Sequence, residues 1–251
     1  MLHNYHTHTF RCNHASGTER EYVEKAIQMG LKTLGFSDHA PHYSARNGDY
    51  YPCWCMRPEL MEDYVTTVRA LAKEYANDIH ILCGVELEYS PDFHRENVEF
   101  LKSFGLDYMI MGQHILGSSR MPYVVNRTCD ADLSYYVSSV LSGLNTGDFL
   151  YLAHPDLHGI GFSQEVVERE YRRLCEGAKR LGIPLELNLL GLRTNRCYPS
   201  MKFFEIAASV GNEIVLGIDA HSVGEFGAGS GASEGEALAK KMGLNLIEKL
   251  L

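Results

Sequence analysis

Two alternating patterns of apolar residues run along the chain. Apolar residues at helical spacing predict helices over Gly17–Met29, Leu60–Tyr75, Val98–Phe104, Leu133–Leu144, Val166–Leu181 and Phe203–Val210. Between them lie short apolar runs of strand length, namely Leu2–Tyr5, Thr33–Phe36, His80–Val85, Tyr108–Met111, Phe149–Ala153, Pro184–Leu187 and Glu213–Ile218. Because most runs are followed by a helical segment, we expect an α/β fold with a parallel sheet and crossover helices.

Seven strand-like runs favour a closed or nearly closed barrel over an open sheet. Local signals mark some helix ends: Thr18 and Glu21 have the spacing of a capping box, and Gly30, Gly182 and Gly211 follow the last apolar positions of three helices. No long repeat, low-complexity run or obvious linker divides the sequence, so we expect a single domain over residues 1–251.

One long segment, Pro41–Pro58, shows neither pattern, and we interpret it as an extended loop over one end of the barrel. It contains Cys53 and Cys55, which are two of seven scattered cysteines. An odd, scattered set is unlike a disulfide framework, so we expect reduced thiols. The Cys53–Trp54–Cys55 stretch has no second cysteine pair, which favours a loop of small apolar residues over a metal chelate.

Composition and charge narrow the functional classes. Of 251 residues, 45% are apolar and 22% are charged, as in a globular protein with a sizeable core. The formal net charge of −9 argues against binding a nucleic acid polymer or an anionic membrane by bulk electrostatics. The stretch MLHNYHTHTF lacks the apolar core of a signal peptide, and no stretch approaches a membrane span. We therefore expect a cytoplasmic protein.

Candidate chemistry appears where the strand-like runs end. Six of the seven runs are followed directly by histidine or acidic residues, which are His6 and His8, Asp38 and His39, Glu86, His114, His154, and Asp219 and His221. In parallel α/β folds the carboxyl ends of the strands form the functional face. His14 lies in the first loop on that face. We expect the histidines to converge there with Glu86 and Asp219.

Such a cluster predicts bound metal. Imidazoles and carboxylates packed together in a partly buried space would leave charge uncompensated, and divalent cations remove that problem. Residues i and i+2 of a strand point to the same side, so His6 and His8 can hold one ion together, and Asp219 and His221 repeat the spacing. Nine ligands at roughly three to four per ion indicate two or three metals. A carboxylate such as Glu86 can bridge two of them.

Each motif alone has a simpler interpretation. A single His-x-His or Asp-x-His is more often a surface or core feature than a metal site, and His154–Pro155 could be a turn. The specificity lies in the recurrence of these residue types at one end of successive strands. The remaining histidines are interpreted as structural or solvent-facing, and they are His3, His42, His80, His94 and His158.

The ordered motifs resemble the PHP (polymerase and histidinol phosphatase) superfamily. The matching stretches are HTHTFRCNH, GFSDHAP, GVELEY, GQHILG, AHPD, ELNLLGLR and GIDAHS, and they cover nearly the whole chain. The resemblance implies a distorted seven-stranded (β/α)7 barrel, similar to a TIM barrel, with a trinuclear metal site. It also implies zinc, iron or manganese as the metals. A nitrogen-rich ligand set does not discriminate among these three metals.

The resemblance implies one set of ligands for each metal. The first metal would bind His6, His8, Glu86 and Asp219; the second would share Glu86 and add His114 and His154; and the third would bind His14, His39 and His221. Glu86, as the bridge, would set the spacing of a catalytic metal pair. The implied activity is hydrolysis of a small phosphomonoester, with L-histidinol phosphate preferred. His221 and Asp38 are conceivable acids for the leaving group or, alternatively, ligands or supporting groups.

Substrate recognition is less sharply indicated. The sixth run leads to Arg193 and Arg196, whose guanidinium groups suit phosphate, and Arg120 is a weaker candidate. Solvated loop arginines are almost as good an interpretation. Glu88, Asp156 and the aromatic loop 43–54 are available to read the rest of histidinol phosphate. Oligomeric state is left open by the sequence.

Three other functions compete with this hypothesis. A phosphoesterase of the same superfamily could act on nucleotides or another phosphorylated metabolite. A catalytically silent metal-binding module is a second possibility, against which the complete ligand set argues. A metal-dependent amidohydrolase is the third, but no lysine stands at the end of a strand-like run.

Overall fold

Parallel strands form two sheets in the computed structural model, which describes residues 1–41, 53–116, 124–126, 128–158 and 160–251. The first sheet has the order β1 (His3–Asn4), β2 (Thr33–His39), β3 (His80–Leu87), β4 (Tyr108–Met111). The second has the order β5 (Leu185–Asn188), β6 (Glu213–Gly217), β7 (Asn245–Leu246). The predicted α/β fold with parallel strands is therefore confirmed.

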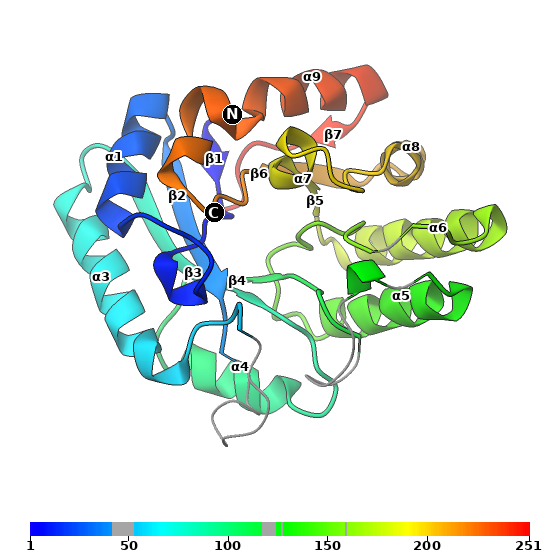
Figure 1. Cartoon of the computed structure of the whole chain (residues 1–251), viewed down its shortest axis with the longest axis horizontal. Helices are drawn as coiled ribbons and strands as arrows, with labels where there is room; N and C mark the ends of the chain where they lie inside the picture. The colour runs from blue at the N-terminus through cyan, green and yellow to red at the C-terminus, as the bar shows by residue number, and fades with distance from the viewer. Residues whose placement is uncertain (42–52, 117–123, 127, 159) are drawn as a thin grey trace.

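Helices connect the strands and lie outside the curled sheets (Figure 1). They are α1 (Glu19–Met29), α3 (Met61–Glu74), α4 (His94–Lys102), α5 (Asp130–Leu144), α6 (Gln164–Leu181), α7 (Leu189–Arg193), α8 (Met201–Val210) and α9 (Ala232–Met242). The capping box predicted at Thr18 and Glu21 is present, and Gly30 ends α1 in the left-handed conformation. The short helix α7 and the helix α9 were not predicted, because α9 has few large apolar residues.

The sheet differs from the prediction of one seven-stranded barrel. The main sheet has four strands, and the run Phe149–Ala153 forms only isolated bridges, from Leu152 to Met111 and to Leu185. Pro184, which lacks an N–H, precedes β5, so the ladder cannot lengthen at that end. The short strand β7 was not among the predicted runs. The two sheets also approach each other at a bridge between Thr7 and Ala220.

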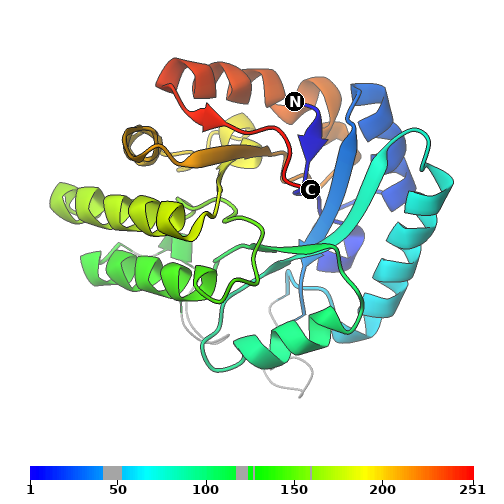
Figure 2. The same cartoon turned by 180° about the vertical axis from the view of Figure 1, so that it is seen from behind.

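Backbone hydrogen bonds beside the Thr7–Ala220 bridge hold two predicted site segments together. The N–H of His8 donates to the carbonyl of Ala220 over 2.9 Å, and the N–H of Asp219 donates to the carbonyl of His6 over 3.0 Å. Figure 2 shows the curled arrangement from behind, with the two marked ends of the chain close to β1. Segments that are far apart in sequence therefore meet at one end of the strands.

Side chains fill the space that the sheets enclose. Tyr5, Leu82, Tyr108, Ile110, Tyr151, Ala153 and Val215 form one buried cluster there. The hydroxyl of Tyr108 donates to the carbonyls of Tyr5 and Phe36, at 2.8 and 3.0 Å. The interior is thus a packed core rather than a channel, and its floor supports the residues at the strand ends.

Two sequence expectations lie wholly or partly outside the described residues. They are the loop Pro41–Pro58, of which residues 42–52 are not described, and Arg120. Among the described helices, none combines the length and the apolar character that crossing a bilayer requires.

The Tyr108 hydroxyl gives a test of the packed interior. Replacing Tyr108 with Phe leaves two buried carbonyls without this donor and should lower the free energy of unfolding by about 1–3 kcal/mol. For a domain of this size that corresponds to a fall in melting temperature of roughly 2–4 °C for each kcal/mol. Tyr135→Phe, at an exposed position on α5, is the matched control and should shift the melting temperature little. Equal shifts in the two variants would contradict the assigned role of Tyr108.

Candidate metal centre

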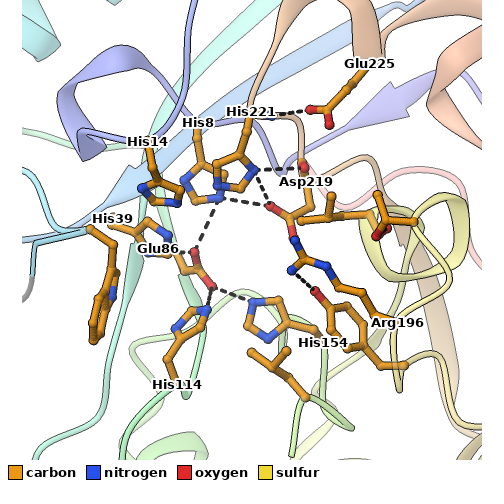
Figure 3. A pocket seen from close by; sticks show the side chains of 15 residues that line it. His8, His14, His39, Glu86, His114, His154, Arg196, Asp219, His221 and Glu225 are labelled. Carbon is orange, nitrogen blue, oxygen red and sulfur yellow. Dashed lines mark hydrogen bonds and ion pairs between the residues drawn. The ribbon is translucent and has the colours of Figure 1, made fainter. Parts of the chain in front are cut away.

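The strand ends deliver the predicted ligands to one cavity of about 470 Å³. Eight of the nine line it directly, namely His8, His14, His39, Glu86, His114, His154, Asp219 and His221. The ninth, His6, is fully buried beside them. Figure 3 shows the labelled side chains pointing toward one another from different strands and loops. The structure thus brings together every residue that the sequence placed in the cluster, while their role as metal ligands stays a prediction.

The carboxylate of Glu86 lies at the middle of the cluster. Its Oε2 is 3.0 Å from Nδ1 of His39, 3.5 Å from Nε2 of His8 and 3.6 Å from Nε2 of His6. Its Oε1 is 2.8 Å from Nε2 of His154 and 3.8 Å from Nε2 of His114. One carboxylate group therefore faces five imidazoles, which is the position required of a bridging ligand.

Asp219 forms a second centre on the other side of His8. Its Oδ1 is 3.1 Å from Nε2 of His8, 3.5 Å from Nε2 of His6 and 3.5 Å from Nδ1 of His221. The two Nε2 atoms of His6 and His8 are themselves 3.2 Å apart. Donor atoms of His6, His8 and Asp219 therefore converge on the same point, as the His-x-His spacing predicted.

The buried polar atoms of this cluster fit a divalent cation. Glu86 Oε2, Asp219 Oδ1 and His8 Nδ1 are buried and make no hydrogen bond among the described residues. Buried carboxylate oxygens without hydrogen bonds are costly unless a cation binds them. Nitrogen and carboxylate oxygen are also the donor set that zinc, iron and manganese accept. The residues present therefore fit bound metal.

A further group lies at the mouth of the cavity. Ligand atoms of His14, His39 and His221 lie within 4.8 Å of one another, and these are the three residues that the resemblance implied for a third metal. His14 is exposed and follows a 3₁₀ turn over Phe10–Cys12. The buried thiol of Cys12 lies within 4.8 Å of donor atoms of His8 and His221. The sequence did not single out Cys12, because a lone cysteine carries little signal.

Backbone conformation at the strand ends is adapted to the cluster. His154 and Asp219 both adopt positive φ angles, of 28° and 51°, which are unusual for residues with a side chain. Gly112 leaves room for Glu86, because a Cβ atom there would lie 1.7 Å from Glu86 Oε1. Such local strain and close approach concentrate at functional sites.

Opposing pKa shifts show how the cluster distributes charge. Burial would raise the pKa of Glu86, but the surrounding imidazoles, those of His39 and His114 foremost, outweigh it and hold this pKa well below its ordinary value. Burial lowers the pKa of His221 to about 3, which leaves its imidazole neutral and able to bind a metal. Burial opposes charge on His6 too, yet Glu186 and Asp219 raise its pKa to about 10. The carboxylates around His6 thus favour a positive charge at this position of the cluster.

Two further carboxylates support ligand histidines. Glu88 is buried and accepts hydrogen bonds from Nδ1 of His114 at 2.7 Å and from its backbone N–H at 3.0 Å. Asp38 accepts from the hydroxyl of Thr9 and from the N–H of His39, and its Oδ1 is 3.6 Å from Nδ1 of His8. Neither lines the cavity, and both contact proposed ligand histidines, so their expected roles toward substrate stay predictions.

The two candidate arginines lie in different surroundings. Arg196 lines the cavity and donates to the hydroxyl of Tyr198 over 3.0 Å. Arg193, by contrast, donates to the carbonyls of Ile218 and Asp219 and pairs with Glu225 at 3.2 Å. Its guanidinium thus fixes the turn that carries Asp219, which differs from the expected contact with phosphate. Arg196 keeps the expected position.

Trp54, from the aromatic loop that the sequence offered for substrate recognition, lines the cavity. Other residues of the cavity wall were not singled out from the sequence, namely Leu157, Leu190, Thr194, Tyr198 and Glu225. Glu225 accepts hydrogen bonds from the N–H groups of His221 and Ser222, the latter over 3.0 Å. A capping-box spacing from Ser222 to Glu225 is the one signal that could have indicated this turn. Leu190 and Thr194 lie in and at the end of the short helix α7, which was not predicted, and Leu157 and Tyr198 lie outside helices and strands.

Comparison with known proteins agrees with this geometry. Residues 4–189 match the family model for the PHP domain. The chain belongs to the PHP domain family. The resemblance drawn from the ordered histidine and acidic motifs is thereby confirmed.

Two relatives of this PHP chain have names that bear on its chemistry. A Deinococcus radiodurans protein named as a probable histidinol-phosphatase is 30% identical over 231 residues, which cover 88% of this chain and 87% of the relative. The histidinol-phosphatase of Bacillus subtilis is 33% identical over 115 residues, which cover 44% and 43% of the two chains.

A solved structure shares the fold of this PHP chain. It is the histidinol phosphate phosphatase of Lactococcus lactis, complexed with zinc, L-histidinol and phosphate. The TM-score is 0.75 at 19% identity, and the match covers 98% of this chain and 95% of the other.

The central position of Glu86 predicts the effect of removing its charge. Glu86→Gln should lower the metal content of the purified protein by at least one equivalent, because five imidazoles then lose the shared carboxylate. His94→Gln is the matched control, since His94 pairs with Asp148 at 3.0 Å and lies outside the cavity lining. Elemental analysis after dialysis measures both. A comparable metal loss in the two variants would mean that the ligand set is wrong.

Proposed function

We propose that this PHP chain is a metal-dependent phosphatase that converts L-histidinol phosphate to L-histidinol and phosphate. The observation that carries the proposal is the convergence of seven histidines, Glu86 and Asp219 on a cavity whose wall holds a guanidinium group. Relatives named for histidinol phosphate hydrolysis support the choice of substrate. A cavity of about 470 Å³ suits a small ligand rather than a polymer.

The proposal includes the architecture. We infer that β1 to β6 together with the segment 149–153 act as one distorted seven-stranded barrel, in which this segment takes the fifth position and β7 is an additional strand beside β6. Support comes from the bridges on either side of Leu152 and from the bridge between Thr7 and Ala220. One buried apolar cluster includes residues from Tyr22 to Ala232, which supports a single domain over residues 1–251.

Two or three divalent cations would be held by the nine proposed ligands. His6, His8, Asp219 and Glu86 would bind the first cation. Glu86 would also bind the second cation, together with His114 and His154. The group at the mouth, His14, His39 and His221, would bind the third. Zinc, iron and manganese all suit this donor set.

The protein's own groups would organise the reaction. When bound, divalent cations neutralise phosphoryl oxygens and lower the pKa of water. Glu86 keeps the two inner ligand groups at a fixed spacing, so that substrate meets a preformed site. Arg196, which lines the cavity, would donate forked hydrogen bonds to the phosphate. Leu157, Leu190 and Trp54 supply an apolar wall that excludes water around the organic part of the substrate.

The surroundings of the proposed enzyme follow from its surface and thiols. The structure describes all seven cysteines and shows no disulfide between them, which suits a reducing, cytoplasmic compartment. The negative net charge supports a small phosphorylated substrate as the partner of the site rather than a nucleic acid polymer or a membrane.

A substrate panel with metal analysis tests this function. The metal-loaded protein should release phosphate from histidinol phosphate with a higher kcat/KM than from a mononucleotide or an aryl phosphate. Chelation should abolish the activity, and zinc, manganese or iron should restore it. Fastest turnover of the mononucleotide would identify a nucleotide phosphoesterase instead. Fewer than two bound metals together with no phosphatase activity would identify a structural module.

Arg196 provides a prediction about phosphate binding. Arg196→Gln should lower kcat/KM by about tenfold to a hundredfold, because a hydrogen bond to a charged group contributes roughly 1.5–3 kcal/mol. Inorganic phosphate should also inhibit this variant less strongly. Arg172→Gln is the control, since Arg172 lies on the outer surface of α6 and pairs with Glu168. Wild-type kinetics in the Arg196 variant would exclude it from phosphate binding.

A further inference from the structure

Beneath the proposed ligands lies a buried carboxylate, Glu186, that is not one of them. It stands on β5 with no exposed surface, and it does not line the cavity. Its Oε1 accepts from Nδ1 of His6 at 2.7 Å, and the hydroxyl of Tyr151 is 3.5 Å away. Its Oε2 accepts from the backbone N–H of His154 and from Nδ2 of Asn188, both at 2.9 Å.

These contacts connect Glu186 to three proposed ligands on three separate segments. It holds the ring of His6 directly and the backbone of His154 at its unusual positive φ angle. Through Asn188, whose Nδ2 also donates to Oδ2 of Asp219 at 3.0 Å, it reaches a third ligand. The proposed first and second metals therefore share one support on the floor of the site.

The contact with His6 decides which ring nitrogen is available. With its proton on Nδ1, held by Glu186, the imidazole presents the lone pair of Nε2. That atom faces Glu86 Oε2 at 3.6 Å and Asp219 Oδ1 at 3.5 Å. The hydrogen bond thus fixes both the tautomer and the orientation that metal binding requires.

The chain makes room for this carboxylate. Gly217, on the neighbouring strand β6, could not carry a side chain, because a Cβ atom there would lie 1.7 Å from Oε1 of Glu186. A buried acidic residue lowers the stability of the fold unless hydrogen bonds or an ion pair compensate its charge. Among the described residues, the ring of His6 lies within ion-pair distance of Glu186, at 2.7 Å. The carboxylate is thus placed where it contacts a proposed ligand directly.

We propose that Glu186 is a positioning residue, which sets the tautomer of His6 and the geometry of His154 and Asp219 for metal binding. The proposal rests on the proposed metal site but not on the identity of the substrate. Glutamine cannot replace glutamate here, because its NH2 group would face His6 Nδ1–H on one side or two N–H donors on the other. Loss of such a support lowers metal affinity by about 10–100-fold in other metal sites.

The test measures zinc affinity by competition with a chelator of known affinity, on the full chain and without substrate. Glu186→Gln should weaken zinc binding by about 10–100-fold. Glu170→Gln is the matched control, because Glu170 is equally buried but lies on α6 beside Arg169 and Arg173. It should lower thermal stability without changing zinc affinity. Unchanged zinc affinity in Glu186→Gln, with a lowered melting temperature of the metal-free protein, would overturn the proposal and leave Glu186 a purely structural residue.

Two additional measurements separate positioning from folding. Nitrogen NMR of the zinc-loaded protein should show the proton of His6 on Nδ1, and Glu186→Gln should alter this signature. Protonation of His6 on Nε2 in the zinc-loaded wild type would overturn the proposal. If the glutamine variant does not fold, Glu186→Asp keeps the charge but shortens its reach, and it should show an intermediate loss of zinc affinity; wild-type affinity would count against the proposal. Because none of these measurements uses phosphate release, a wrong substrate would leave their outcome unchanged.

Discussion

Two buried carboxylates surrounded by imidazoles govern the organisation of this molecule. Glu86 and Asp219 each face at least three imidazole nitrogens, and oxygens of both lack hydrogen bonds among the described residues. A core of ordinary composition could not hold such a group without a compensating cation. The curled parallel sheets make the arrangement possible, because they bring the ends of β1, β2, β3 and β6 to one place.

Successive layers of residues support these proposed ligands. Nearest the cavity are the imidazoles, behind them lie Glu88, Asp38 and Glu186, and behind those lie backbone groups and the aromatic interior around Tyr108. Arg193 plays the corresponding part at the turn after β6, where it binds two carbonyl oxygens. The geometry of the proposed site therefore depends on residues that do not line the cavity.

Much of this was predictable because the relevant signals are local. Strand ends rich in histidine and acid are visible in sequence, since parallel strands place those ends on one face. The partners of a side chain are decided by tertiary packing, so the sequence, which favoured Arg193 over Arg196 for phosphate, could not show that Arg193 binds backbone carbonyls while Arg196 lines the cavity. Glu186 was overlooked for the same reason, although a charged residue inside the apolar stretch LELN is a detectable anomaly. The incomplete fifth strand also escaped prediction, because an apolar run does not reveal whether its neighbours can pair with it.

The bridge between Thr7 and Ala220 has a consequence for how the protein matures. It joins the segment that carries His6 and His8 to the segment that carries Asp219 and His221, more than 200 positions later in the chain. During synthesis the earlier histidines leave the ribosome long before their acidic counterpart exists. The ligand set proposed for the first metal is therefore complete only after translation has passed β6.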